Sequence, residues 1–103
     1  MSGALIRLKP GDLVENVASE QRGVVVTAAS YNARSLRVLA TRVTWQSTGN
    51  PYEVALPDPL QGAAVLADMV VCVPRAHLRV VGDVSPDVLA QVLRKLRDLL
   101  PRG

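Results

Sequence analysis

The sequence predicts one mainly β domain that ends in an α-helix, and three observations carry that prediction. The chain has 103 residues, a length typical of a single domain. It contains no Phe although 49% of its residues are apolar, so its core must be built from Val, Leu and Ala, which favours strands. Short apolar runs separated by turn residues extend to residue 82, and an amphipathic helical pattern follows.

Three strands are predicted in the first half of the chain. The turn signal KPGD at Lys9–Asp12 precedes a short strand with the sequence LVENV. Gly23–Ala29 is a continuous apolar run bounded by turn residues, which indicates a buried strand, and the following SYNARS is expected to be a loop. Leu36–Trp45 is the longest strand candidate.

Alternation along this third strand decides which side chains share a face. Arg42 and Thr44 fall on one face, and Trp45 falls on the other. The pattern therefore favours the core or a dimer interface for Trp45 over a base-stacking role.

Shorter elements are predicted in the second half. YEVAL alternates as a strand, and PDPLQG is a Pro-rich connection. AAVLADMVVCV is an apolar strand candidate interrupted by Asp68, and Cys72 within it is expected to be a small buried hydrophobe. PRAHL fits a single helical turn, and RVVG fits a last short strand.

The C-terminal helix has clear start and stop signals. Ser85 suits the N-cap, Pro86 the first helical position and Asp87 the positive end of the helix, and Pro101 ends it. One face of this helix is apolar. Its residues are Val88, Leu89, Val92, Leu93, Leu96, Leu99 and Leu100.

Composition excludes several kinds of chemistry. His77 and Cys72 are the only residues of their types, so neither a paired-histidine ribonuclease site nor an internal disulfide can form, and no metal-ligand cluster is evident. The net charge of +3 is compatible with an anionic partner. No apolar run reaches the length of a membrane span and no signal peptide is evident, so we expect a cytoplasmic protein without a cofactor or metal.

Cleavage of RNA remains open to such a chain, because RNA carries its own nucleophile, the 2′-hydroxyl. An enzyme then needs to move protons and to stabilise a dianionic phosphorane. Glu20, Arg22 and Thr44 would supply these functions if the fold brought them together.

The order of the motifs resembles the MazF/PemK family of toxin endoribonucleases. Between Lys9 and Leu100 the chain carries, in order, PGDLV, SEQRG, VLATRVTWQ, NPYEVALP, GAAVLADMVVCV and HLRVVGDVSPDVLAQVLRKL. The ending, a glycine, a hydrophobic residue and Ser-Pro before a terminal helix, is the most specific part. Order and spacing together carry the resemblance.

The resemblance implies a fold and a function. It implies a small SH3-like antiparallel barrel in a single domain, residues 1–103, with a curved sheet over 10–82 and a helix over 85–100. It implies a homodimeric toxin that cleaves single-stranded RNA without metal, leaving a 2′,3′-cyclic phosphate and a 5′-hydroxyl. A cognate antitoxin would block the RNA groove of such a toxin.

The resemblance also assigns roles to residues. Arg22 matches the catalytic arginine that follows a Ser-Glu-Gln-like triplet, Thr44 matches the catalytic threonine that ends the third strand, and Glu20 would orient Arg22 or act as base. The expected RNA-binding side chains share polar or charged ends. They are Gln21, Arg42, Gln46 and Asp68.

The chain departs from the family pattern in places, and alternatives stay open. The loop before Arg22 is short, Gly23 stands where the family has proline, and Met69 replaces the amide after Asp68. A degenerate member that acts as a binding module is therefore one alternative. A gyrase poison of the CcdB type is another, although the ending LLPRG lacks the aromatic residue associated with that activity.

Overall fold

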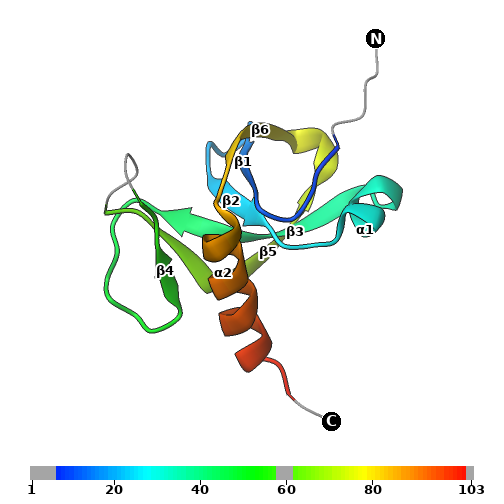
Figure 1. Ribbon diagram of the computed structural model, residues 1–103. Coiled ribbons are helices and arrows are strands. Elements are labelled where there is room, and N and C mark those ends of the chain that lie inside the picture. Colours follow the sequence, from blue (N-terminus) through cyan, green and yellow to red (C-terminus); the bar gives the residue numbers. More distant parts are fainter. Residues whose placement is uncertain (1–6, 58–61, 102–103) are drawn as a thin grey trace.

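The fold is a curved, six-stranded antiparallel sheet with a helix packed on one side (Figure 1). The computed structural model describes residues 7–57 and 62–101. The sheet order is β4-β5-β3-β2-β1-β6. The strands are β1 (Asp12–Asn16), β2 (Arg22–Val25), β3 (Arg37–Thr44), β4 (Glu53–Ala55), β5 (Ala64–Pro74) and β6 (Leu78–Asp83). The prediction of a mainly β fold with a C-terminal helix is confirmed.

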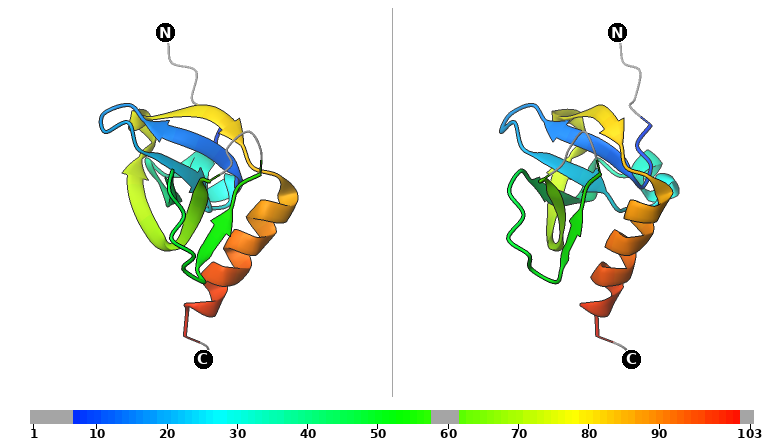
Figure 2. Two further views of the ribbon diagram at one scale, coloured as in Figure 1. Left: turned by 90° about the vertical axis from the view of Figure 1, so that its left-hand side faces the viewer. Right: turned by 60° about the vertical axis from the view of Figure 1, so that its left-hand side comes forward.

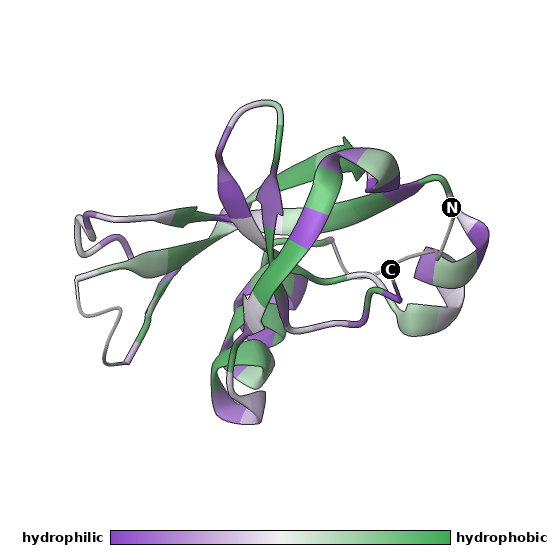
Figure 3. Cartoon of the chain, turned by 90° about the horizontal axis from the view of Figure 1, so that it is seen from above, coloured by the Kyte–Doolittle hydropathy of each residue, from purple (hydrophilic) through white to green (hydrophobic). Residues whose placement is uncertain are grey.

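Both faces of the sheet bury side chains, so consecutive apolar residues of β1 and β2 are buried on opposite sides. Leu13 and Val24 belong to one core, whereas their neighbours Val14 and Val25 belong to a second core on the opposite face. Apolar residues dominate the strands, and polar residues gather in the connections and along part of the helix (Figure 3).

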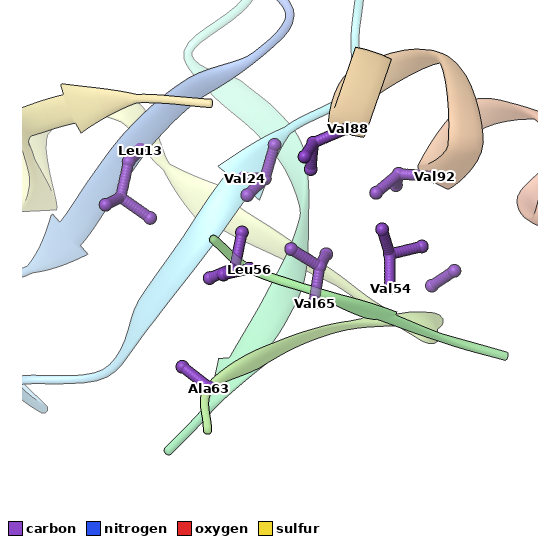
Figure 4. Packing of buried hydrophobic residues seen from close by; sticks show 9 residues of the cluster. Leu13, Val24, Val54, Leu56, Ala63, Val65, Val88 and Val92 are labelled. Carbon is purple, nitrogen blue, oxygen red and sulfur yellow. The ribbon is translucent and has the colours of Figure 1, made fainter. Parts of the chain in front are cut away.

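The first core lies between the sheet and α2 (Pro86–Asp98). The helix packs on β5 and β4, and Figure 2 shows it running alongside the sheet. Val88 and Val92 of the helix point toward Val54 and Val65 of the strands (Figure 4). At the helix N-terminus the Ser85 hydroxyl accepts a hydrogen bond from the Val88 amide at 3.2 Å, so the predicted cap is confirmed.

A short helix, α1 (Ala29–Arg34), occupies the segment that the sequence predicts to be a loop and shortens the strand expected over Gly23–Ala29. Its anchor is the buried side chain of Asn32. The Asn32 Nδ2 atom donates to the carbonyl oxygens of Leu8 at 3.0 Å and Thr27 at 2.9 Å, and Thr27 Oγ1 donates to Asn32 Oδ1 at 2.6 Å. These long-range partners stabilise α1, and no local periodicity reveals them.

Strand β5 changes register halfway along its length. Thr41 of β3 pairs with Val70, but Val43 pairs with Val65, so residues 66–69 of β5 bulge opposite Arg42. Residues 68–72, at the end of this bulge and just after it, are exposed, and Cys72 is one of them. The expectation of a buried Cys72 is therefore wrong, because an apolar run in this strand does not mean burial within one copy of the chain.

Within residues 7–57 and 62–101, no helix is both long and apolar enough to cross a membrane.

Candidate active site

A carboxylate joins two arginines across the strands β2, β1 and β6 at one end of the sheet. Glu15 of β1 is the direct cross-strand partner of Arg22 on β2 and of Arg79 on β6, so the three side chains share one face of the sheet. Arg79 donates to Glu15 Oε1 from Nε at 2.9 Å and from Nη2 at 2.5 Å. Arg22 Nε donates to Glu15 Oε2 at 3.4 Å. Strand register therefore determines where the Arg22 guanidinium lies.

Glu15 is ionised at neutral pH. Its side chain is only 14% exposed, and that of Arg22 is 31% exposed. The hydrogen bond from Arg79 holds the pKa of Glu15 below its ordinary value; partial desolvation opposes this effect, and the hydrogen bond from Arg22 adds to it. A charged, partly shielded carboxylate at this position keeps Arg22 in place.

Trp45 lies beside Arg22 rather than in the core. The Arg22 guanidinium carbon is 5.4 Å from the centroid of the Trp45 ring, and Trp45 is 60% exposed. The prediction of a core position for Trp45 is wrong, because β3 ends at Thr44 and the alternation of buried and exposed faces ends with it. A dimer contact for Trp45 stays a prediction.

Thr44 sits at the end of β3, and its hydroxyl is held in a tight turn. Thr44 Oγ1 accepts from the Gln46 amide and donates to the Gln46 carbonyl oxygen, both at 3.3 Å. Among the described residues, the Arg22 side chain has no hydrogen bond to Thr44; its recorded partners are Glu15 and Trp45. The two proposed catalytic groups are therefore held separately, each by its own neighbours.

The loop after Trp45 is held by Glu53 of β4. The Glu53 carboxylate accepts hydrogen bonds from Ser47 Oγ at 2.7 Å, from the Thr48 amide at 3.0 Å and from Thr48 Oγ1 at 2.7 Å. These bonds, led by the one from the Thr48 side chain, hold the pKa of Glu53 below its ordinary value. The segment that carries Trp45 and Gln46 is thus held by hydrogen bonds at its C-terminal end, at Ser47 and Thr48.

A small hollow of about 30 Å³ opens beside Arg22. It brings together three of the expected RNA-binding or catalytic residues, Gln21, Arg22 and Arg42. Val14, Asn16, Gly23, Ala40, Val71, Val73 and Leu78 line the rest of it. Asp68 lies in the β5 bulge opposite Arg42 and is exposed, as is Met69.

Glu20 occupies the turn between β1 and β2. Its backbone is left-handed, with φ of 63°, and its amide donates to the Asn16 carbonyl oxygen at 2.7 Å. No ion pair of Glu20 is present in the described part of the chain, and the carboxylate that contacts Arg22 is Glu15. Cross-strand pairing points Glu15, and not the turn residue Glu20, at Arg22, and the role expected for Glu20 stays a prediction.

Sequence reasoning missed both Glu15 and Arg79. For Glu15 a signal existed, because β1 and β2 are joined by a short connection and a hairpin register could have paired Glu15 with Arg22. For Arg79 no local signal existed, since β6 meets β1 only in the folded sheet.

Residues 7–57 and 62–101 contain no group of three or more His, Cys, Asp or Glu side chains placed to hold a metal ion.

Comparison with known proteins shows the family. A family model described as PemK-like, MazF-like toxin of type II toxin–antitoxin system matches residues 5–100. A crystal structure of MazE–MazF from Deinococcus radiodurans is 32% identical, covers 95% of this chain and 99% of that chain, and has a TM-score of 0.84.

Two mycobacterial structures share the fold. An endoribonuclease from a mycobacterial species is 24% identical, covers 98% of this chain and 100% of that chain, and has a TM-score of 0.81. An endoribonuclease in complex with its cognate antitoxin, also mycobacterial, is 23% identical, covers 95% of this chain and 100% of that chain, and has a TM-score of 0.78. No curated protein sequence matches the chain.

Proposed function

Because the chain belongs to the PemK-like, MazF-like toxin family of type II toxin–antitoxin systems, we propose that it is a toxin that cleaves single-stranded RNA in the cytoplasm without a metal ion. The single observation that carries this proposal is Arg22, a permanently charged group held by Glu15 at the rim of a hollow that Arg42 and Gln21 also line.

In the proposed reaction the RNA supplies the nucleophile. The 2′-oxygen attacks the adjacent phosphorus as it loses its proton to a base, for which we propose Glu20 in the exposed turn. The bond from phosphorus to the 5′-oxygen breaks, and that oxygen takes up a proton from water, to which Glu20 returns the proton it accepted. A 2′,3′-cyclic phosphate and a 5′-hydroxyl result.

Arg22 stabilises the dianionic phosphorane between these two steps. Its Nε is engaged by Glu15, which leaves the two Nη groups to donate to phosphate oxygens. Thr44, at the end of β3, is proposed to donate its hydroxyl to the same phosphate after releasing Gln46. Arg22 acts electrostatically, through its guanidinium charge and its N–H donors.

Binding of the strand is assigned to the polar residues around the hollow. Arg42 neutralises a neighbouring phosphate. Gln21, Gln46 and Asp68 contact the RNA through their amide and carboxylate groups. Asp68 is exposed on the β5 bulge opposite Arg42, which suits contact with a base rather than with a phosphate.

We also propose a homodimer and a cognate antitoxin as partners. β6 is an edge strand of the sheet, and Val80 and Val81 on it are exposed, as are Val70 and Val71 on β5. An apolar edge of this kind is usually covered in a stable protein. The antitoxin would compete with RNA for the surface around Arg22.

The test is cleavage of single-stranded RNA by the purified chain in the presence of EDTA. We expect 5′-hydroxyl products, and we expect Arg22→Ala to lose about 100-fold or more of the rate, as when one transition-state donor is removed. Arg37→Ala, an exposed arginine at the start of β3, is the matched control and should cleave like the parent. Cleavage by Arg22→Ala at the parental rate would refute the assignment.

A binding module remains the second candidate, on one observation. Met69 is exposed on the bulge where the family pattern expects an amide next to Asp68. A dimer that binds RNA and its antitoxin but cleaves no single-stranded RNA would establish this alternative.

A further inference from the structure

Trp45 is a large aromatic side chain that is exposed to solvent next to Arg22. It is the chain's only tryptophan, and 60% of it is accessible although it follows directly on the buried strand β3. The central carbon of the Arg22 guanidinium lies 5.4 Å from the centroid of its ring. A large indole left open to solvent beside a functional arginine requires an explanation, since single aromatic side chains of this size are usually covered.

The backbone that carries Trp45 is held on both sides. Thr44 and Gln46 bond to each other across it, and Glu53 fixes Ser47 and Thr48 just beyond. The indole is therefore presented on a preorganised turn, so that little conformational freedom would be lost when a ligand stacks on it.

Arg22 connects this ring with the second arginine of the site. Arg22 lies over it, and Arg22 and Arg42 line the same hollow. An aromatic platform flanked by arginines is the combination by which proteins hold single strands, because bases stack on the ring while arginines neutralise phosphates. Charge complementarity thus favours an unpaired polynucleotide over an apolar protein segment.

We propose that Trp45 is a stacking platform for an RNA base next to the phosphate that Arg22 contacts. This proposal rests on the proposed function of Arg22 and adds a subsite to it. Arg22 then has two partners in the complex, the scissile phosphate and the indole that supports the neighbouring base. Stacking is tolerant of base identity, so Trp45 contributes affinity and placement of the strand rather than sequence choice.

The experiment uses the intrinsic fluorescence of Trp45, which reports on this subsite alone because no other tryptophan is present. The probe is a mixed-sequence, single-stranded RNA oligonucleotide that is 2′-O-methylated, so that it binds but is not cleaved. Binding is measured in parallel by the anisotropy of an end label, and cleavage is measured on the unmodified RNA.

We expect saturable quenching of Trp45 fluorescence that follows the anisotropy curve. Trp45→Ala should weaken binding about 10- to 100-fold, the loss of one stacked base, and Trp45→Phe should restore most of it. Leu36→Ala is the matched control, because Leu36 is 80% exposed and lies at the other end of β3. That variant should bind like the parent.

Several outcomes would overturn the proposal, and they differ from failure of the proposed function. Oligonucleotide binding without any change in Trp45 fluorescence, together with parental affinity of Trp45→Ala, refutes the platform even if the RNA is cleaved. A blue-shifted emission that the oligonucleotide does not alter assigns Trp45 to a contact between copies of the chain and also refutes it. Quenching without cleavage supports the platform and contradicts the nuclease.

Discussion

Gly23 lies where β2 and β3 leave no room for a side chain, and replacing it with alanine tests the packing that positions Arg22. A Cβ atom at Gly23 would lie 2.9 Å from the Thr41 carbonyl oxygen and 3.2 Å from the Ala40 Cβ. The first of these distances is too short for a real contact and involves backbone, so the strands must separate locally. Glycine is therefore needed at this position because β2 and β3 lie too close for a side chain, and not because the backbone adopts a turn conformation.

The magnitude follows from two opposing terms. Overpacking of a fitted interior costs about 1–3 kcal/mol. Alanine also restricts the unfolded chain more than glycine does, which raises the free energy of unfolding by about 0.4–1 kcal/mol. With central values of about 2 and about 0.7 kcal/mol for these terms, Gly23→Ala should lose about 1.3 kcal/mol of unfolding free energy, which lowers the Tm by about 5–10 °C in a domain of this size.

Gly82→Ala is the matched control for this prediction. Gly82 lies in β6, and the nearest atom to an added Cβ there is Leu13 Cδ2 at 3.9 Å, an ordinary contact. Its Tm should be unchanged or slightly raised. Both variants are compared with the parent by thermal unfolding at one protein concentration, since self-association would shift the midpoint. If the Gly23→Ala Tm equals that of Gly82→Ala, the close approach of β2 and β3 is refuted.

The remaining predictions concern charge and capping. The pKa of Glu15 is lowered in the folded chain, so ionised Glu15 stabilises the fold above the ordinary Glu pKa of about 4.3, and this stabilisation is lost as the pH falls through the folded pKa. The free energy of unfolding in urea should therefore fall less between pH 6 and pH 3 for Glu15→Gln than for the parent. An identical fall would contradict the ion pair. Ser85→Ala should lower the free energy of unfolding by about 1 kcal/mol because the helix cap is lost, and the Tm is the readout. Ser30→Ala is the neutral control, because Ser30 lies on α1, whose N-cap makes no side-chain hydrogen bond. Arg42→Gln should reduce the slope of log affinity for single-stranded RNA against log salt by about 0.7, and an unchanged slope would show that Arg42 contacts no phosphate.

Local chemistry was sufficient to predict most of the fold. Ser85 and Pro86 define the start of α2, and the turn KPGD contains Gly11, whose positive φ of 93° suits glycine, just before β1. Short apolar runs between turn residues predict the strands. The helix α1 could not be predicted in this way, because the buried Asn32 depends on Leu8, which lies far away in the sequence.

The site could be predicted only in part, for a similar reason. The order of the motifs along the chain predicts Arg22 and Thr44 as site residues, and their roles stay predictions. Glu15 reaches Arg22 through the hairpin pairing of β1 with β2, which the short connection between these strands indicates. Arg79 joins them only through the pairing of β1 with β6, for which the sequence carries no local signal. Trp45 was misplaced because a two-residue alternation was extended one position past the end of β3.

The most direct test of the proposed mechanism removes the nucleophile and leaves the protein untouched. Once a cleavage position is mapped, the same RNA is made with a single 2′-deoxynucleotide on the 5′ side of that phosphate and is incubated with the parent chain in EDTA. The 2′-oxygen mechanism predicts that cleavage stops at that position while every other cut continues. Continued cleavage at the 2′-deoxy position would contradict it.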